Sequence, residues 1–336
     1  MSNKTLGCLG VVLVTALCAS LLVNVSFLAS KGTNGSSTDA AGPAETLHES
    51  LVRKASSGSE KKIALIPLRG IISAAEPGNV GLTAIDDLKL QLEQAAADKQ
   101  VAAVVLAIDS PGGEVTASDI LYKAVRRVRD DSGKPVVVSM GSLAASGGYY
   151  VACGASWVLA HENTFTGSIG VIMQSLNYEQ LFGKLGLETL TFKSGAFKDM
   201  LSGSRPMRDE EKAYVQAMIM QTYDQFVGIV AQERHLPEAD LRKGVADGRV
   251  VSGKDALGAK LVDQLGGIEE AYAKAMELAN AQGASVIRYE SGFKLGRLLR
   301  MLGQSEQARV QVDLAASLAP KLETGRMYYL PSLFAH

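Results

Sequence analysis

The sequence predicts an α/β fold built from stacked βαβ units around a mostly parallel sheet, and two observations predict it. From residue 61 to residue 282, short apolar segments of strand length alternate with longer segments whose apolar residues recur at helical spacing. The central segments are apolar throughout, as in VAAVVLAID (101–109), which is typical of strands covered by helices on both faces of a sheet.

The expected elements follow in chain order. The strands are expected at 63–68, 101–109, 136–140, 157–160, 168–173 and 188–192. The helices are expected at 82–98, 115–131, 178–186 and 208–235, followed by a short helix–strand piece at 254–267 and a last helix ending near residue 281. Along the helix at 208–235, Tyr214, Met218, Tyr223 and Phe226 recur near helical spacing, so we expect them in the core. No internal repeat is visible, so one catalytic domain is expected.

Composition sets broad limits on function. The chain has 336 residues, of which 47% are hydrophobic, so it can bury a full globular core. Its formal net charge of −1 gives no reason to expect a nucleic-acid partner. The cysteines Cys8, Cys18 and Cys153 lie in hydrophobic segments without pairing or metal-ligand spacing, so we interpret them as buried apolar residues.

The N-terminal segment 5–30 contains no charged side chain and is long enough to cross a bilayer as a helix. We therefore expect a single-span anchor with the bulk of the chain outside the cytoplasm, and a cleaved signal peptide is the alternative. The expected domain organisation is an anchor at 1–31, a flexible linker at 32–60, a peptidase-like domain at 61–282 and a C-terminal extension at 283–336. A basic amphipathic helix at 293–302 in this extension is expected to contact the membrane surface, a neighbouring subunit or the core.

Ser146 stands in a stretch of small residues, MGSLAASGGYYVACGA (140–155). Such a stretch fits a closely packed helix start, and it equally fits a nucleophile that a substrate must approach. A Ser-His-Asp hydrolase is a poor fit, because Ala144 stands where a G-x-S-x-G elbow needs glycine. Of the four histidines, His161 alone falls within the α/β core, and nothing about its position pairs it with a serine.

A lysine can replace histidine as the base if it is neutral when needed. The reference pKa of lysine is about 10.4, so burial must lower that pKa by several units before the amine can accept a serine proton. The stretch KSGAFKDMLSGSRPM (193–207) offers Lys193 and Lys198 in a loop that follows a predicted strand. Spacing alone leaves open which of the two, if either, is buried.

The segment DSPGGE (109–114) lies at the C-terminal end of a buried strand, where α/β sheets place their sites. Its paired glycines allow a backbone N–H to approach a ligand closely, and a turn between strand and helix is the simpler interpretation. A donor aimed at a developing oxyanion is worth about 3–4 kcal/mol. Gly147, directly after Ser146, can supply a second N–H.

Five motifs recur together in an order that resembles one family, bacterial signal peptide peptidase A in its short, single-repeat form. They are DSPGG, LAASGGYYVACGA, TFTGSIGVI, KSGAFKD and ADGRVVSGKDALGAKLVDQLGG. The resemblance covers residues 63–278 and implies a ClpP/crotonase-like fold with a Ser-Lys dyad. Carried over motif by motif, it implies that Ser146 is the nucleophile, Lys198 the general base and Ser168 the hydroxyl that orients the lysine, with Gly113 and Gly147 as the oxyanion donors.

The resemblance also implies a function. It implies an endopeptidase anchored in the cytoplasmic (inner) membrane, with its catalytic domain on the extracytoplasmic side. That enzyme degrades cleaved signal peptides and other apolar peptides through an acyl-enzyme, without metal or cofactor. We expect small residues near the cut bond. A ring- or dome-shaped homo-oligomer such as an octamer is implied, in which the lysine of one protomer completes the site of its neighbour.

Three other functions stay open at this point. A crotonase-like enzyme acting on acyl thioesters shares the fold, but it needs no serine-lysine pair. A catalytically silent membrane scaffold would keep the fold for assembly alone. A related membrane Ser-Lys protease would use the same chemistry to cut an intact membrane protein.

Overall fold

The computed structural model describes residues 47–56, 58–74, 84–290 and 327–329. The chain divides into two units, Met1–Thr46 and Leu47–His336, and every described residue belongs to the second. Within these described ranges, no helix is long and apolar enough to cross a bilayer. The anchor predicted at 1–31 and the basic helix predicted at 293–302 lie outside the described residues.

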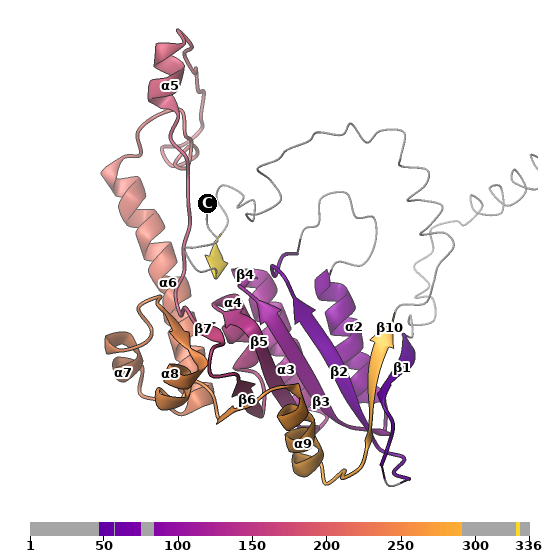
Figure 1. The fold of residues 1–336 in the computed structure, drawn as a ribbon. Helices are drawn as coiled ribbons and strands as arrows, with labels where there is room; N and C mark the ends of the chain where they lie inside the picture. The colour runs from indigo at the N-terminus through magenta and orange to yellow at the C-terminus, as the bar shows by residue number, and fades with distance from the viewer. Residues whose placement is uncertain (1–46, 57, 75–83, 291–326, 330–336) are drawn as a thin grey trace, which may run out of the picture. The chain divides into compact units, whose positions relative to one another are not determined.

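A nine-stranded sheet runs through the described part of the second unit, in the order β1-β10-β2-β3-β5-β6-β9, with β7 attached to β5 and β8 to β7 (Figure 1). Its strands are β1 (His48–Arg53), β2 (Lys62–Arg69), β3 (Val101–Ser110), β5 (Val136–Ala145), β6 (Trp157–Ala160), β7 (Phe165–Gly167), β8 (Val250–Ser252), β9 (Gln264–Leu265) and β10 (Ser285–Glu290). All neighbours from β10 to β9 are parallel, whereas β1 and β8 pair antiparallel. The predicted α/β fold with a mostly parallel sheet is confirmed.

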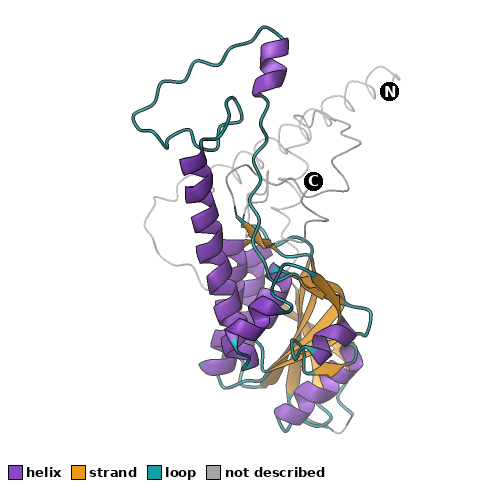
Figure 2. Cartoon of the chain, turned by 90° about the vertical axis from the view of Figure 1, so that its left-hand side faces the viewer, coloured by secondary structure: helices purple, strands orange, loops and turns teal. Residues whose placement is uncertain are grey.

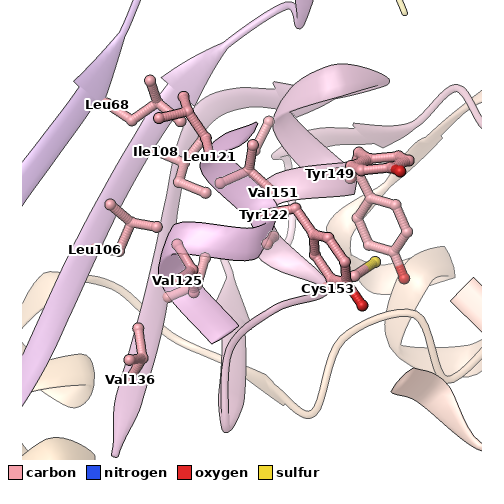
Figure 3. Close-up of a cluster of buried hydrophobic side chains, with 14 of the residues drawn as sticks. Leu68, Leu106, Ile108, Leu121, Tyr122, Val125, Val136, Tyr149, Val151 and Cys153 are labelled. Carbon is pink, nitrogen blue, oxygen red and sulfur yellow. The ribbon is translucent and has the colours of Figure 1, made fainter. Parts of the chain in front are cut away.

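Helices cover both faces of the sheet because its central strands are apolar on both sides. These helices are α2 (Ala84–Ala97) and α3 (Val115–Asp130) on one face and α9 (Ile268–Leu278) on the other. On the first face, Leu106 belongs to the same buried cluster as Leu121 (Figure 3). On the second, Val105 belongs to a cluster with Ala271. Successive residues of β3 thus point to opposite cores, as strand geometry requires.

Cys153 lies in the first of these cores, close to the ring of Tyr149 (Figure 3). It is 3% exposed and makes no disulfide. Burial raises the pKa of its thiol to about 12, so the reactive thiolate is suppressed. Its interpretation as a buried apolar residue is confirmed, while Cys8 and Cys18 lie outside the described residues.

The described residues form five further helices, α4 (Gly147–Ala152), α5 (Glu179–Lys184), α6 (Asp209–Arg234), α7 (Glu238–Lys243) and α8 (Gly253–Gly258). Of these, α5, α6 and α7 lie between β7 and β8, where the chain leaves the sheet and returns. Residues 173–208, called the arm below, run out past α5 and come back to the start of α6 (Figures 1 and 2). The long helix α6 then leads back toward α4, against which it packs.

Three local predictions in this region are wrong. The strand expected at 188–192 is an unpaired loop, in which Phe192 is 95% exposed. The strand expected at 168–173 is displaced to β7, because Ser168 has a φ of +50° that ends the extended ladder. Tyr214 is 53% exposed on the part of α6 nearest the arm, whereas Phe226 is fully buried as expected. Helical periodicity predicted the helix correctly, but it did not predict which part of the helix is buried in the core.

The two strands at one edge of the sheet lie in segments for which no strand was predicted. β1 falls in the predicted linker and β10 in the predicted C-terminal extension, and the two pair with each other antiparallel. β1 is mostly exposed, so its sequence lacks the alternation of apolar and polar residues that predicts a strand. Backbone hydrogen bonds to a neighbouring strand hold such an edge segment, and these bonds leave little trace in side-chain pattern.

Candidate active site

Ser146 occupies the turn between β5 and α4. Its backbone has a φ of +53° and a ψ of −115°, a region that is strained for a residue with a Cβ atom. The strain is held in place by a fully buried side chain and by a hydrogen bond of 2.8 Å from the Ser146 N–H to the carbonyl of Gly167. A sharp, strained strand-to-helix turn is the geometry by which α/β hydrolases present a nucleophile.

The hydroxyl of Ser146 is itself unusual. Its Oγ is buried and has no hydrogen-bond partner among the described residues. A buried polar atom without a partner costs about 1–3 kcal/mol, so native structures keep few of them. Backbone strain and an unsatisfied hydroxyl at the same residue are typical of a functional site.

Three glycines bring their backbones together beside Ser146. Gly112 has a φ of +99°, and a Cβ atom there would lie 2.5 Å from the backbone nitrogen of Gly147. A Cβ atom on Gly147 would lie 3.1 Å from the nitrogen of Gly113. The backbones of Gly113 and Gly147, the predicted oxyanion donors, are therefore in close contact. Gly147 begins α4, so the helix itself provides no acceptor for its N–H.

Ser118 belongs to this cluster, although it was not among the site residues predicted from the sequence. Its fully buried Oγ donates to the carbonyl of Glu114 at 2.8 Å and would lie 2.5 Å from a Cβ atom on Gly147. The Ser118 hydroxyl packs against the contact between Gly113 and Gly147, and it leaves no space for a side chain at position 147. A small polar residue one turn into the helix that follows DSPGGE was the available signal.

Ser168 lies next to the residue that holds the nucleophile. β5 and β7 are parallel neighbours with Ala145 opposite Gly167, so Ser146 and Ser168 follow directly at the ends of adjacent strands. Ser168 is 3% exposed and donates its N–H to the carbonyl of Arg249 at 2.8 Å. The structure thus gathers four of the five predicted site residues at one end of the sheet.

Lys198, the fifth, is not gathered with them. It lies on the arm and is exposed, and its side chain makes no hydrogen bond or ion pair among the described residues. Since Ser146 Oγ has no partner there either, the two groups do not meet within one chain. The alternative lysine, Lys193, forms an ion pair with Asp199 at 2.7 Å, so its ammonium is already engaged.

The loop that bears Lys198 is fastened to the start of α6. Arg205 donates to both carboxylate oxygens of Asp199, at 2.8 and 2.9 Å, and to both of Glu211, at 2.6 and 2.9 Å. Glu211 also accepts from Arg208 at 2.7 Å. The hydrogen bonds from Arg205 are the largest cause that holds the pKa of both carboxyls well below their usual range. We call this group of four charged residues the arm anchor.

His161 stands apart from this site. It lines a separate hollow of about 570 Å³ on the face of the sheet beside α9, where it adjoins Gly267 and Glu270. No hydrogen bond links it to a serine among the described residues. Within the same residues, no group of three His, Cys, Asp or Glu side chains is placed to hold a metal ion.

A short strand far along the chain also reaches the site, and the sequence did not predict it. β11 (Tyr328–Tyr329) pairs antiparallel with β4 (Gly113–Glu114), which places Tyr329 opposite Gly113. On its other side, Tyr328 exchanges two backbone hydrogen bonds of 3.1 Å with Ile172. An aromatic pair near the C-terminus was its only signal.

Comparisons with known proteins agree with this site. Residues 77–164 match the Clp protease family, and residues 128–282 match peptidase family S49. Together with the fold and the strained serine, these matches define a serine-type peptidase with a ClpP-like α/β domain. The chain belongs to peptidase family S49.

Three relatives illustrate the family. A protein of Methanocaldococcus jannaschii, provisionally named a protease, is 41% identical over 59% of this chain and 63% of its own length. A protein of Enterococcus faecium with the provisional name signal peptide peptidase SppA is 36% identical over 69% of this chain and 68% of its own. A Synechocystis protein, also provisionally named a protease, is 38% identical over 66% and 76% respectively.

Proposed function

We propose that this protein is a membrane-anchored serine endopeptidase that degrades cleaved signal peptides and other apolar peptides with a Ser-Lys dyad. The observation that carries the proposal is the buried, strained and unpartnered hydroxyl of Ser146 beside the backbones of Gly113 and Gly147. The name of the Enterococcus faecium relative supports the substrate class. The uncharged segment at 5–30 would hold the enzyme at the cytoplasmic membrane, with its catalytic domain on the extracytoplasmic side.

In the proposed mechanism, Ser146 Oγ attacks the carbonyl carbon of a peptide bond, and its proton passes to Lys198 Nζ. The oxyanion that forms accepts hydrogen bonds from the N–H groups of Gly113 and Gly147. As the C–N bond breaks, Lys198 returns the proton to the leaving amine, which leaves an acyl ester on Ser146. Lys198 then takes a proton from water, the hydroxide attacks the ester, and Ser146 regains its proton.

The lysine in this mechanism comes from a second copy of the chain. In the part of the chain that the structure describes, the exposed Lys198 side chain has no partner and neither does the Ser146 hydroxyl, so each group lacks what the other supplies. Ser168, which follows the strand next to that of Ser146, lines a hollow of about 330 Å³ between residues 168–172 and α6, and an incoming lysine that enters this hollow would reach Ser168. The hydroxyl of Ser168 would then orient the amine. Such an arrangement is a heterologous contact, the type that generates rings.

The test uses full-length protein and a fluorogenic apolar peptide, with hydrolysis followed from pH 6 to 10. Ser146→Ala and Lys198→Ala should abolish hydrolysis while leaving the assembly intact. Ser168→Ala should be slowed, with an altered pH profile, because it orients the base and forms no bond to substrate. Lys193→Ala is the matched control and should retain most activity, since Asp199 keeps Arg205 as a partner. An active Ser146→Ala variant would refute the proposal.

A further inference from the structure

The end of β5 that leads into Ser146 changes its neighbour in the sheet. β5 pairs with β6 through residues 137–139 and with β7 through residues 143–145. Two threonine hydroxyls bind the backbone of β5 where this change takes place. Thr164 Oγ1 donates to the carbonyl of Gly141 at 2.7 Å. Thr166 Oγ1 donates to the carbonyl of Ala144, also at 2.7 Å. Side chains therefore help to fasten the part of the strand that carries the nucleophile.

The hydrogen bond from Thr166 is the nearer of the two to the nucleophile. Ala144 stands two residues before Ser146, and both Thr166 and Ala144 are fully buried. The next residue of β7, Gly167, accepts the N–H of Ser146 at 2.8 Å. Two successive residues of β7 thus hold the backbone immediately before the nucleophile, one by its side chain and one by its carbonyl.

This grip bears on the strained conformation of Ser146. A residue with a φ of +53° and a ψ of −115° keeps that conformation only where its surroundings over-determine it. On the far side of the turn, the Ser146 carbonyl accepts the N–H of Tyr150 at 2.8 Å as α4 begins. The backbone is therefore held before and after Ser146, and this fixes the direction of its Cα–Cβ bond.

We infer that Thr166 is a positioning residue of the active site. Its hydroxyl is engaged by Ala144, so it acts through the backbone of Ser146 and sets where Oγ lies relative to the oxyanion donors. The inference rests on the proposed function and adds a residue to its site. A misplacement of reacting atoms by about 1 Å can cost about 10²-fold in rate, so a single fastening this close to the nucleophile has a large effect.

Thr164 provides the matched control. It is also buried, and its hydroxyl also donates to a carbonyl of β5 at 2.7 Å, but that carbonyl lies five residues before Ser146. Thr164 Oγ1 accepts the N–H of His161 at 3.0 Å as well. Loss of the Thr164 hydroxyl should therefore cost at least as much thermal stability as loss of the Thr166 hydroxyl, but less activity.

The test compares full-length parent protein with Thr166→Val, Thr164→Val and Thr166→Ser. Steady-state hydrolysis of a fluorogenic apolar peptide gives kcat and KM, and thermal unfolding gives stability. Thr166→Val should lower kcat by about tenfold or more and leave KM within about twofold, because the lost alignment acts on the reaction step. Thr164→Val should keep most of the parent kcat. Thr166→Ser keeps the hydroxyl and should restore most of what Thr166→Val loses.

A second readout needs no peptide. A fluorophosphonate reacts with a serine hydroxyl, forming an O–P bond and releasing fluoride, and mass spectrometry follows its addition to Ser146. This rate should fall with kcat in Thr166→Val and stay near the parent rate in Thr164→Val.

Equal loss of kcat in Thr166→Val and Thr164→Val would overturn the inference and assign the effect to general destabilisation. Thr166→Ser as slow as Thr166→Val would overturn it too, because the methyl group and not the hydroxyl would then matter. If the parent cuts no peptide but Thr166→Val alone slows the labelling of Ser146, the proposed function fails while the positioning role stands. If peptide is cut only with Ser146 present and Thr166→Val cuts as fast as the parent, the function stands and the positioning role fails.

Discussion

At Gly147 the effect of one methyl group can be worked out from its neighbours. The Cβ atom of an alanine would lie 2.5 Å from Ser118 Oγ and 3.1 Å from the nitrogen of Gly113, and both neighbours are held in place. Real Cβ atoms essentially never come within 2.5 Å of another atom, and 3.1 Å is tighter than most of their contacts, so the surrounding segments have to shift apart. That separation changes the geometry of both expected oxyanion donors.

We therefore expect Gly147→Ala to lower kcat by about 10²–10³-fold, the typical effect of losing an oxyanion donor. Thermal unfolding and steady-state kinetics on the same sample measure stability and activity separately. Adding Ser118→Gly removes the closer of the two clashing atoms and should restore part of the activity. Wild-type activity in Gly147→Ala alone would show that this backbone contact has no role in the reaction.

The residues that carry chemistry differ in how far the sequence could place them. Ser146, Gly113 and Gly147 lie within a continuous strand–loop–helix pattern, and their proximity follows from two adjacent parallel strands. Lys198 follows no such pattern, because its loop is fastened by ion pairs instead of by an apolar face. The proximity of Tyr329 to Gly113 depends on a contact between distant parts of the chain, which local periodicity does not encode.

At the scale of elements, the arm shows how a segment keeps its shape without a core of its own. Leu190 and Phe192 are largely exposed, so apolar burial contributes little there. The arm anchor instead fixes the returning loop to α6, and Glu211 is fully buried within it. This accounts for the wrong strand prediction at 188–192: alternating apolar residues were present, but no neighbouring strand was.

We expect Arg205→Met to reduce kcat by about tenfold or more, because the loop that positions Lys198 loses its central fastening. Lys193 and Arg208 remain as partners for Asp199 and Glu211, so the overall fold should persist. Arg242→Met is the matched control, since Arg242 also bridges two carboxylates, those of Asp224 and Glu238, away from the arm. Equal loss in both variants would assign the effect to general destabilisation.

The arm anchor also predicts a pH dependence of the arm's stability. Folding lowers the pKa of both Asp199 and Glu211, chiefly through Arg205. A carboxyl of this kind stabilises the folded arm above its unfolded pKa of about 4, and the contribution is lost as the pH falls below that value. Hydrogen exchange in residues 193–208, corrected for intrinsic rates, should therefore be steady from pH 8 to 5 and faster at pH 3. Arg205→Met should be faster throughout.

At the scale of the whole molecule, the proposed division of the dyad makes a quantitative prediction. Ser146→Ala protein keeps its lysine, and Lys198→Ala protein keeps its serine. If equal amounts are unfolded and reassembled together, about a quarter of the sites in a closed ring should combine an intact serine with an intact neighbouring lysine. Peptide hydrolysis should recover to about that fraction of wild type. A mixture as inactive as its components, with mixed assemblies verified by mass, would place the base within the same chain.

The absence of a contact between the Lys198 side chain and its own Ser146 hydroxyl among the described residues has a consequence for the life of a newly made chain. Under the proposed mechanism, a single copy without a base beside its nucleophile would be inert, whatever peptides surround it. Proteolysis would then begin only where enough copies gather, so the local concentration of the enzyme would decide when cutting starts. A nascent copy could fold next to vulnerable polypeptides without harming them.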